Sequence, residues 1–223
     1  MRSARPAALG RLAGATVMSV DPAGKHLLIR FSGGLSLHTH MRMRGAWHLY
    51  QPGERWQRPA HQARAVLDFD DAVAVCFAAP VVDLVRDAGA TVAHLGPDIL
   101  GGTWRPEEVL SRVRVSAVAT LGEMLLDQTL CAGIGNIYKC ESLWTRRLDP
   151  WLSPAACDDA TIRDLYLEAR EQMRAHLTGA GIRRRAVHGR AGRPCPRCGA
   201  PIAVRAQGEH ARMTFHCPRC QMS

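Results

Sequence analysis

The chain lacks three features that would place a protein at a membrane or outside the cell. It has no apolar run long enough to span a bilayer, no basic amphipathic helix with an aromatic face, and no start that resembles a signal peptide. Internal repeats and low-complexity segments are also missing. We therefore expect a cytoplasmic globular protein with no membrane partner, whose cysteines stay reduced.

Acidic residues are nearly missing from the end of the chain. Residues 179–223 hold nine arginines and a single acid, Glu209, which makes this stretch +8 of the whole chain's +9. The planar guanidinium group favours partners that offer bidentate acceptors, as phosphates do. The sequence therefore predicts a polyanionic partner, and nucleic acid rather than a membrane surface.

The same basic stretch carries two Cys-x-x-Cys pairs. Ile202–Arg205 and Arg212–Phe215 are typical of two hairpin strands, with one cysteine pair at each end. Such a hairpin directs four sulfurs at one point, so we expect a zinc ribbon whose ligands are Cys195, Cys198, Cys217 and Cys220. Two disulfides are the alternative, but they require an oxidising compartment. Four sulfur ligands leave no position for an activated water, so the expected cofactor is one structural Zn²⁺.

The other four cysteines show no ligand spacing, and we expect them to be buried, reduced thiols: Cys76, Cys131, Cys140 and Cys157.

The first part of the chain consists of short runs of alternating polarity, separated by turn signals such as Asp21-Pro22-Ala23-Gly24 and Gln51-Pro52-Gly53. This pattern predicts an antiparallel β-sandwich. The expected strands are Thr16–Val20, His26–Phe31, Leu35–His40, Trp47–Tyr50, Ala63–Phe69 and Ala72–Phe77.

The pattern becomes helical after His94. A helix is expected to start at Arg105-Pro106, because a proline in the first turn is followed by acids. Further helices are expected at Val118–Gln128, Ile137–Arg146 and Asp158–Leu177. The fold class is therefore α+β and multidomain, with a β-sandwich domain at 1–102, a helical domain at 103–180 and a zinc ribbon at 181–223.

Two glycines stand in the turn between the second and third of these helices, in Gly133-Ile134-Gly135-Asn136. Glycines just before a helix expose backbone N–H groups that can bind a phosphate, and Asn136 can cap the helix or donate its amide outward. A tight connection closed by an N-cap would give the same pattern.

Several blocks together resemble the formamidopyrimidine-DNA glycosylase and endonuclease VIII family. The turn and its flanking helices resemble the family's helix-two-turn-helix element, and Val187–Pro194 runs directly into the four cysteines. Upstream, Gly24–Leu27 and His38–Met43 stand in the family's order. The chain is more similar to endonuclease VIII than to the 8-oxoguanine enzyme. This resemblance implies a monomeric, nucleoid-associated protein that binds damaged DNA.

Five residues of the sandwich, the last of them His94, acquire roles from this resemblance. Met43, between Arg42 and Arg44, is an apolar wedge that fills the gap left by an extruded base. An exposed hairpin tip is the alternative. Lys25 matches the family lysine that assists proton transfer and binds the phosphate next to the lesion.

His94 precedes Leu95-Gly96-Pro97-Asp98, where relatives can carry an arginine that contacts DNA.

The resemblance also assigns roles in the second half. Arg212 matches the ribbon arginine that contacts phosphates and helps the second elimination, and Arg190 is implied to contact DNA. Gly135 and Asn136 are implied to bind the backbone of the duplex, and Glu141 to orient their turn through a hydrogen bond. Glu141 could equally be an ordinary surface residue.

The front of the chain departs from the family pattern. Members begin, after removal of Met, with Pro-Glu, in which the proline amine is the nucleophile, whereas this chain begins Met1-Arg2-Ser3-Ala4-Arg5-Pro6. The nitrogen of Pro6 is in an amide bond and cannot attack. We therefore expect a sandwich without its first helix, either because the start codon lies further upstream or because the gene is truncated.

The expected function is that of a DNA glycosylase with abasic-site lyase activity, acting in base excision repair on oxidised bases, pyrimidines in particular. The alternative is a non-catalytic or truncated protein that binds damaged DNA without a nucleophile. A zinc ribbon that recognises RNA would leave the Arg42-Met43-Arg44 loop unexplained.

Overall fold

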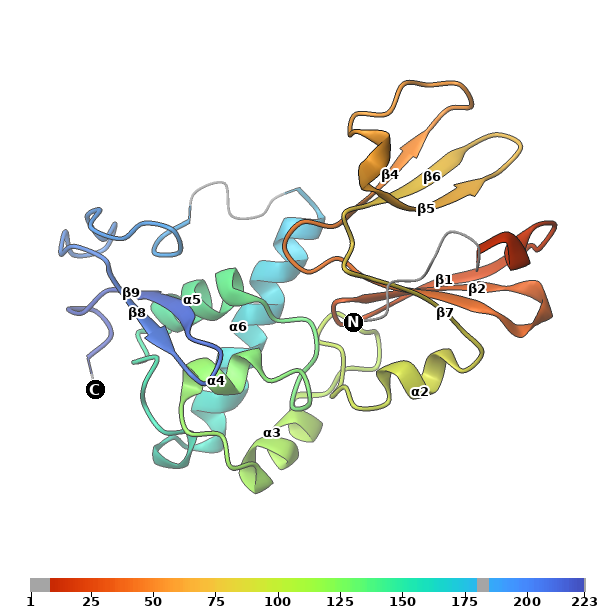
Figure 1. Ribbon diagram of the computed structural model, residues 1–223. Helices are drawn as coiled ribbons and strands as arrows, with labels where there is room; N and C mark the ends of the chain where they lie inside the picture. The colour runs from red at the N-terminus through yellow and green to blue at the C-terminus, as the bar shows by residue number, and fades with distance from the viewer. Residues whose placement is uncertain (1–8, 180–184, 223) are drawn as a thin grey trace. The chain divides into compact units, whose positions relative to one another are not determined.

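The computed structural model describes residues 9–179 and 185–222, so the predictions about Met1–Pro6 lie outside the described residues. The chain forms two compact units, residues 1–94 and 95–223 (Figure 1). The predicted boundaries of three domains, at 102 and 180, stay a prediction.

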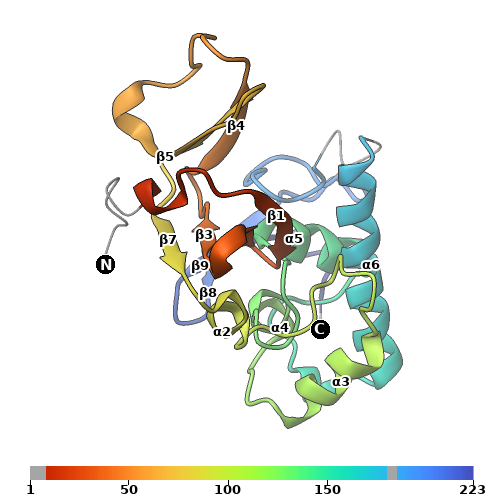
Figure 2. The same cartoon turned by 90° about the vertical axis from the view of Figure 1, so that its right-hand side faces the viewer.

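Two antiparallel sheets form the first unit, and they lie one above the other in Figures 1 and 2. One sheet has the order β1-β2-β3-β7 and the other β4-β6-β5. The 3-10 turn η1 (Gly10–Leu12) precedes the first strand, η2 (Ser32–Gly34) joins β2 to β3, η3 (Ala60–Gln62) precedes β5, and helix α2 (Ala88–Val92) follows β7. The strands are β1 (Val17–Ala23), β2 (His26–Phe31), β3 (Ser36–His40), β4 (Ala46–Tyr50), β5 (Ala63–Asp68), β6 (Val73–Phe77) and β7 (Val81–Val85).

The core of this unit lies between the two sheets. Ile29 and Leu37 from the first sheet pack with Leu67 and Cys76 from the second. On the outer face of β6, Phe77 packs with Tyr50 and Trp56 from the strand and loop beside it. The predicted β-sandwich is therefore present, because the alternating strands each bury one row of side chains between the layers.

Strand β1 runs further than expected. Pro22 and Ala23 belong to the strand and pair with Leu27 and His26, and the turn is Gly24-Lys25. Proline is tolerated because β1 is an edge strand, where a missing N–H group breaks no ladder. Gly24 has φ 59°, which suits the first position of a two-residue hairpin turn.

The second unit consists of helices around one core, with a two-stranded hairpin. Helix α6 packs against α3 and α5, as Figure 2 shows, and Tyr166 of α6 is fully buried. The 3-10 turn η4 (Pro154–Ala156) precedes α6. The other elements are α3 (Pro106–Val115), α4 (Leu121–Leu126), α5 (Asn136–Thr145), α6 (Asp159–Leu177), β8 (Ala203–Gln207) and β9 (Arg212–His216).

Helix caps explain where these helices begin. Thr120 caps α4 by accepting from the Glu123 N–H, so α4 is shorter than the expected Val118–Gln128. Asp158 caps α6 by accepting from the Thr161 N–H at 2.7 Å. Gly135, and not Asn136, is the N-cap of α5, so the amide of Asn136 is available for another contact.

Candidate nucleic-acid interface and metal centre

Four cysteine sulfurs of the second unit meet at one point. The Sγ atoms of Cys195, Cys198, Cys217 and Cys220 all lie within 4.8 Å of one another. The two Cys-x-x-Cys turns hold them, since the Gly199 N–H donates to the Cys195 carbonyl and the Gln221 N–H to the Cys217 carbonyl. No other group of three or more potential ligands occurs among the described residues. This donor set fits a tetrahedral metal ion.

Burial and mutual proximity make four thiolates costly at this site unless a cation lies among them. Burial opposes ionisation of Cys195, but backbone N–H groups of Arg197 and Cys198 and the Trp144 indole lower its pKa to about 6. Burial and the neighbouring sulfurs raise the pKa of Cys217, and they raise that of Cys220 to about 12. Four thiolates therefore need a positive ion between them.

Helix α5 closes one side of the cysteine cluster. The Trp144 indole N–H donates to Cys195 Sγ at 3.4 Å, and Arg197 stacks on the indole with its guanidinium carbon 4.0 Å from the ring centre. Cys140, on the same helix, packs with the buried ligand residues. The sequence pattern gave no sign of Trp144, because its role depends on a contact between residues far apart in the chain.

The remaining cysteines are free thiols among the described residues. Cys76, Cys131 and Cys140 are buried as predicted, and burial raises the pKa of Cys76 and of Cys131 to about 12. Cys157 is only half-buried.

The glycine turn before α5 is held from inside by Gln128. Its carboxamide donates to the Ile134 carbonyl and accepts from the Gly133 N–H at 3.0 Å. Gly133 has φ 110°, and a Cβ there would lie 3.1 Å from Ile99. At Gly135 a Cβ would meet nothing within 4 Å, so open space lies beside the start of α5.

Asn136 connects this turn to the cysteine hairpin. Its amide donates to the Met213 carbonyl of β9 at 2.8 Å and lies 3.4 Å from His188 Nε2. Arg212, the residue before Met213, is exposed. The structure thus brings together two of the predicted site residues, which are 76 positions apart in the sequence.

Glu141 is buried, with 3 % of its surface exposed. Its carboxylate accepts backbone N–H groups of Ala186 at 2.8 Å, Val187 at 3.0 Å and His188 at 2.8 Å. It therefore holds the segment that leads into the ribbon, rather than the turn at Asn136. The interpretation as an ordinary surface residue is wrong.

Arg190 also bonds inside the protein. Its guanidinium donates to the carbonyls of Arg185 and Pro194, at 3.1 and 3.0 Å. These bonds close the loop ahead of the first cysteine pair.

In the first unit, Met43 is the most exposed large apolar side chain described, at 89 %. The loop around it is tightly constrained: the Arg42 N–H donates to His40 Nδ1, and the Gly45 N–H donates to the Met41 carbonyl at 2.9 Å. A Cβ at Gly45 would lie 2.7 Å from that carbonyl oxygen. We call residues 41–45 the wedge loop.

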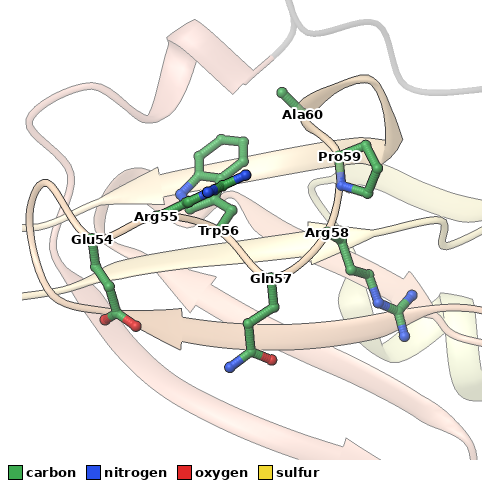
Figure 3. Close-up of a pocket in the computed structure, with 7 residues that line it drawn as sticks. All are labelled: Glu54, Arg55, Trp56, Gln57, Arg58, Pro59 and Ala60. Carbon is green, nitrogen blue, oxygen red and sulfur yellow. The ribbon is translucent and has the colours of Figure 1, made fainter.

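Arg58 braces the wedge loop from the neighbouring β4–β5 connection. Its guanidinium donates to the Arg44 carbonyl at 3.0 Å. Residues 54–60 line a pocket, and in Figure 3 the side chains of Trp56 and Arg58 leave this loop in opposite directions. Sequence reasoning missed Arg58, since no motif marks an arginine that binds a backbone carbonyl.

Histidines gather beside Lys25 on the outer face of the first sheet. His26 pairs with His40 across the strands, His26 Nδ1 lies 2.7 Å from His38 Nε2, and the rings of His26 and His94 are 6.1 Å apart. Burial, and then the proximity of His40 and His38, lowers the pKa of His26 to about 4. Lys25 and His94 are themselves exposed. His26 is therefore neutral at physiological pH.

No helix among the described residues is long and apolar enough to cross a membrane.

Comparisons with known proteins agree with this architecture. Residues 1–80 match the formamidopyrimidine-DNA glycosylase N-terminal domain, and residues 95–186 match the H2TH domain of the same enzymes. The chain is 45 % identical over 222 residues to the probable endonuclease 8 2 of Streptomyces coelicolor, covering 94 % of this chain and 80 % of that protein. It is 36 % identical to the DNA-(apurinic or apyrimidinic site) lyase Nei2 of Mycolicibacterium smegmatis, covering 94 % and 84 %.

Among solved structures, the MutM (Fpg) protein of Thermus thermophilus matches with a TM-score of 0.76 and 28 % identity, over 93 % of this chain and 84 % of that one. The two domain families match the parts of the chain that form the two sheets and the helical turn. The chain belongs to the formamidopyrimidine-DNA glycosylase and endonuclease VIII family.

Proposed function

We propose that this protein is a DNA glycosylase with abasic-site lyase activity, acting in base excision repair on oxidised bases, pyrimidines in particular. The observation that carries the proposal is its 45 % identity to a probable endonuclease 8 over 94 % of the chain. The alternative of a non-catalytic binding protein is not favoured, because another relative of similar coverage is named as a lyase.

The second unit is proposed to bind the DNA backbone. Asn136 and Arg212 lie together where the open start of α5 meets β9, and N–H groups at a helix start attract phosphate oxygens. Arg212 adds a charged, bidentate donor. Arg190 acts there mainly through the loop that it closes.

The first unit is proposed to supply the wedge and the chemistry. Met43 can enter the space of an extruded base, while Arg42 and Arg44 bind the orphaned base and its backbone. Lys25 is proposed to bind the phosphate at the lesion and to assist proton transfer, with His94 at the edge of the same face.

The metal is proposed to be zinc, held by the four cysteines. Their sulfur donors and mutual distances suit Zn²⁺, and four protein ligands leave no open position, so the ion stabilises the hairpin and takes no part in the reaction. We further propose a monomer that binds damaged DNA in the cytoplasm, at the nucleoid.

The activity can be tested with a duplex that contains one abasic site. The 223-residue chain should cleave the strand at that site, and borohydride should trap it covalently on the DNA by reducing the imine that a lysine amine forms with the abasic sugar, with loss of water. Binding without cleavage or trapping would support the non-catalytic alternative. The absence of both binding and cleavage would refute the proposal. A Lys25→Ala variant tests Lys25 as the trapped amine, since equal trapping by both proteins would exclude it.

Salt dependence tests the phosphate contacts separately. Affinity for the abasic duplex should fall steeply as salt rises, because each arginine–phosphate contact releases counterions. Arg212→Ala should reduce the slope of log K against log salt by about one unit, if Arg212 contacts one phosphate. The matched control is Arg163→Ala, an exposed arginine on α6 near Asp164, whose slope should equal that of the wild type.

A further inference from the structure

Lys139 is a fully buried lysine in the middle of the proposed DNA-binding unit. It lies one turn after Asn136 on α5, and none of its surface is exposed. Within the described part of the chain it forms no ion pair; its ammonium donates to Thr214 Oγ1 at 2.6 Å. Burial lowers the pKa of Lys139. A buried charge of this kind is costly unless hydrogen bonds compensate it.

A chain of hydrogen bonds leads away from Lys139. An ammonium group can only donate, so Thr214 accepts there and is free to donate its own proton to Gln207 Oε1 at 2.8 Å. The alternative acceptor for that proton is the Arg212 carbonyl, which is further away at 3.3 Å. Gln207 in turn donates from its amide to Thr120 Oγ1 at 2.9 Å and to the Pro150 carbonyl at 2.7 Å.

The chain ends on a carboxylate. The Thr120 hydroxyl donates to Glu123 Oε2 at 2.6 Å. Every link then runs in one direction, from the ammonium of Lys139 to the carboxylate of Glu123, through side chains of α5, β9, β8 and α4. Hydrogen bonds arranged head to tail between opposite charges polarise one another and become stronger. We call these five residues the buried polar chain, although its end at Thr120 and Glu123 is only half-buried.

Close packing shows that this arrangement is specific. Gly122 of α4 lies against the Gln207 side chain so tightly that a Cβ would collide with it. A Cβ at Gly208, just after β8, would lie 3.0 Å from Glu123 Oε1. Gln207 and Thr214 are buried, with 6 % and 0 % of their surfaces exposed. The hairpin is therefore fixed to α4 and α5 by polar contacts as well as by its sulfurs.

This position matters for the proposed phosphate contacts, on which the inference rests. Thr214 is two residues from Arg212, and Met213 between them accepts the amide of Asn136. We propose that the buried polar chain sets the position of the hairpin on α5, so that Lys139, Thr214 and Gln207 are positioning residues for the contact of Arg212 with DNA.

The variant Thr214→Val tests, without DNA, whether the buried polar chain fixes the hairpin on α5. Valine has nearly the same shape but removes both links, which leaves the Lys139 ammonium and Gln207 Oε1 unsatisfied. Amide hydrogen exchange at 203–216 should become faster by about tenfold or more, while exchange in α6 should stay at the wild-type rate. Thr214→Ser keeps the hydroxyl and should restore slow exchange. Wild-type exchange in Thr214→Val would overturn the proposal.

A double-mutant cycle of Thr214→Val with Arg212→Ala tests whether the buried polar chain positions Arg212 for DNA binding. The probe is a duplex that carries an uncleavable tetrahydrofuran abasic site. Thr214→Val should weaken binding about fivefold to tenfold when Arg212 is present, and less than twofold in the Arg212→Ala background. Equal effects in both backgrounds would overturn the positioning role. The control is Thr39→Val, a fully buried threonine of β3 in the other unit, whose effect should be independent of Arg212.

If Thr214→Val alone fails to fold, Lys139→Met with Thr214→Val removes the charge together with its acceptor. Replacing a buried charge by an apolar group of similar size is often tolerated. This double variant should fold, yet still show fast hairpin exchange and a loss of binding that is larger when Arg212 is present than in the Arg212→Ala background; wild-type exchange and binding would overturn the proposal. Failure of the wild-type chain to bind the duplex would instead refute the proposed function, and the exchange result is independent of that outcome.

Discussion

A single carboxylate holds the ribbon segment on the helical core. Glu141 accepts three consecutive backbone N–H groups, of residues 186–188, in a buried site. Hydrogen bonds to an ionised group are stronger than those between neutral groups, so this contact concentrates much binding energy in one side chain.

Glu141→Gln should lower the free energy of unfolding by about 2–4 kcal/mol, because the glutamine NH₂ group meets backbone donors where an oxygen accepted them. Urea unfolding measures the change. Glu171→Gln, an exposed residue on α6, is the control and should shift stability by less than about 0.5 kcal/mol. An equal, small effect of both substitutions would contradict the role of Glu141.

The histidine cluster predicts a loss of stability in mild acid. His26 has a pKa of about 4 in the folded protein against 6.5 ordinarily, so the unfolded chain binds the proton more tightly between these values. The free energy of unfolding should therefore fall as pH drops from about 6.5 to about 4, by about 1–2 kcal/mol after solvent screening. Thermal unfolding at both pH values measures this, and His26→Gln should show a smaller change. A pH-independent wild type would contradict the prediction.

At the scale of secondary structure, the sequence predicted the strands better than the helix ends. His26–Phe31 was predicted with the observed bounds, because its alternation is regular and turns stand on both sides. Strand β7 and helix α2 were missed. Only Val82 of β7 is buried, and α2 has five residues with no apolar periodicity, although Asp87 could have signalled its N-cap.

The wedge loop shows what local pattern cannot predict. The sequence marked Arg42, Met43 and Arg44 through a family resemblance, but the support from Arg58 comes from 14 residues away. Contacts between distant residues depend on the tertiary fold, so they are visible only in the structure. The same holds for Asn136 and Met213, and for Trp144 and Cys195.

Arg58→Ala should loosen the wedge loop and weaken binding to a duplex with an abasic site by about threefold to tenfold, since one hydrogen bond to a carbonyl is lost. Fluorescence anisotropy gives the affinity. Arg55→Ala, in the same loop and with the same change of charge, is the matched control and should have a smaller effect. Equal losses would mean that charge alone, and not the brace, determines binding.

At the scale of the whole molecule, charge and metal are coupled. Four thiolates and the proposed Zn²⁺ would together carry −2, so residues 179–223 would keep a charge of about +6 with the metal bound. The arginine excess predicted that residues 179–223 bind a polyanion, and the apolar periodicity predicted the helices that precede them. It could not predict that α5 packs on the cysteine cluster through Cys140 and Trp144, because packing partners leave no periodic trace.

Removing the metal should unfold the hairpin and abolish specific DNA binding while the first unit keeps its sheets. Atomic spectroscopy should find one zinc per chain, and a strong chelator should release it and make four further thiols reactive. Cys217→Ser should reproduce the loss, whereas Cys157→Ser, at a half-buried cysteine outside the cluster, should not. Full binding by the metal-free chain would contradict a structural role for zinc.

Helix α5 begins at Asn136, which contacts Met213, and ends beside Trp144, which contacts Cys195. One short helix therefore connects the cysteine cluster with the proposed DNA contacts. From Asn136 to Trp144 it spans about 12 Å at the usual rise per residue. A change at the sulfurs would therefore also displace Asn136 at the other end of α5. Loss of the proposed ion would therefore be felt at Asn136 and Arg212, the residues proposed to contact DNA, and not only at the cysteines.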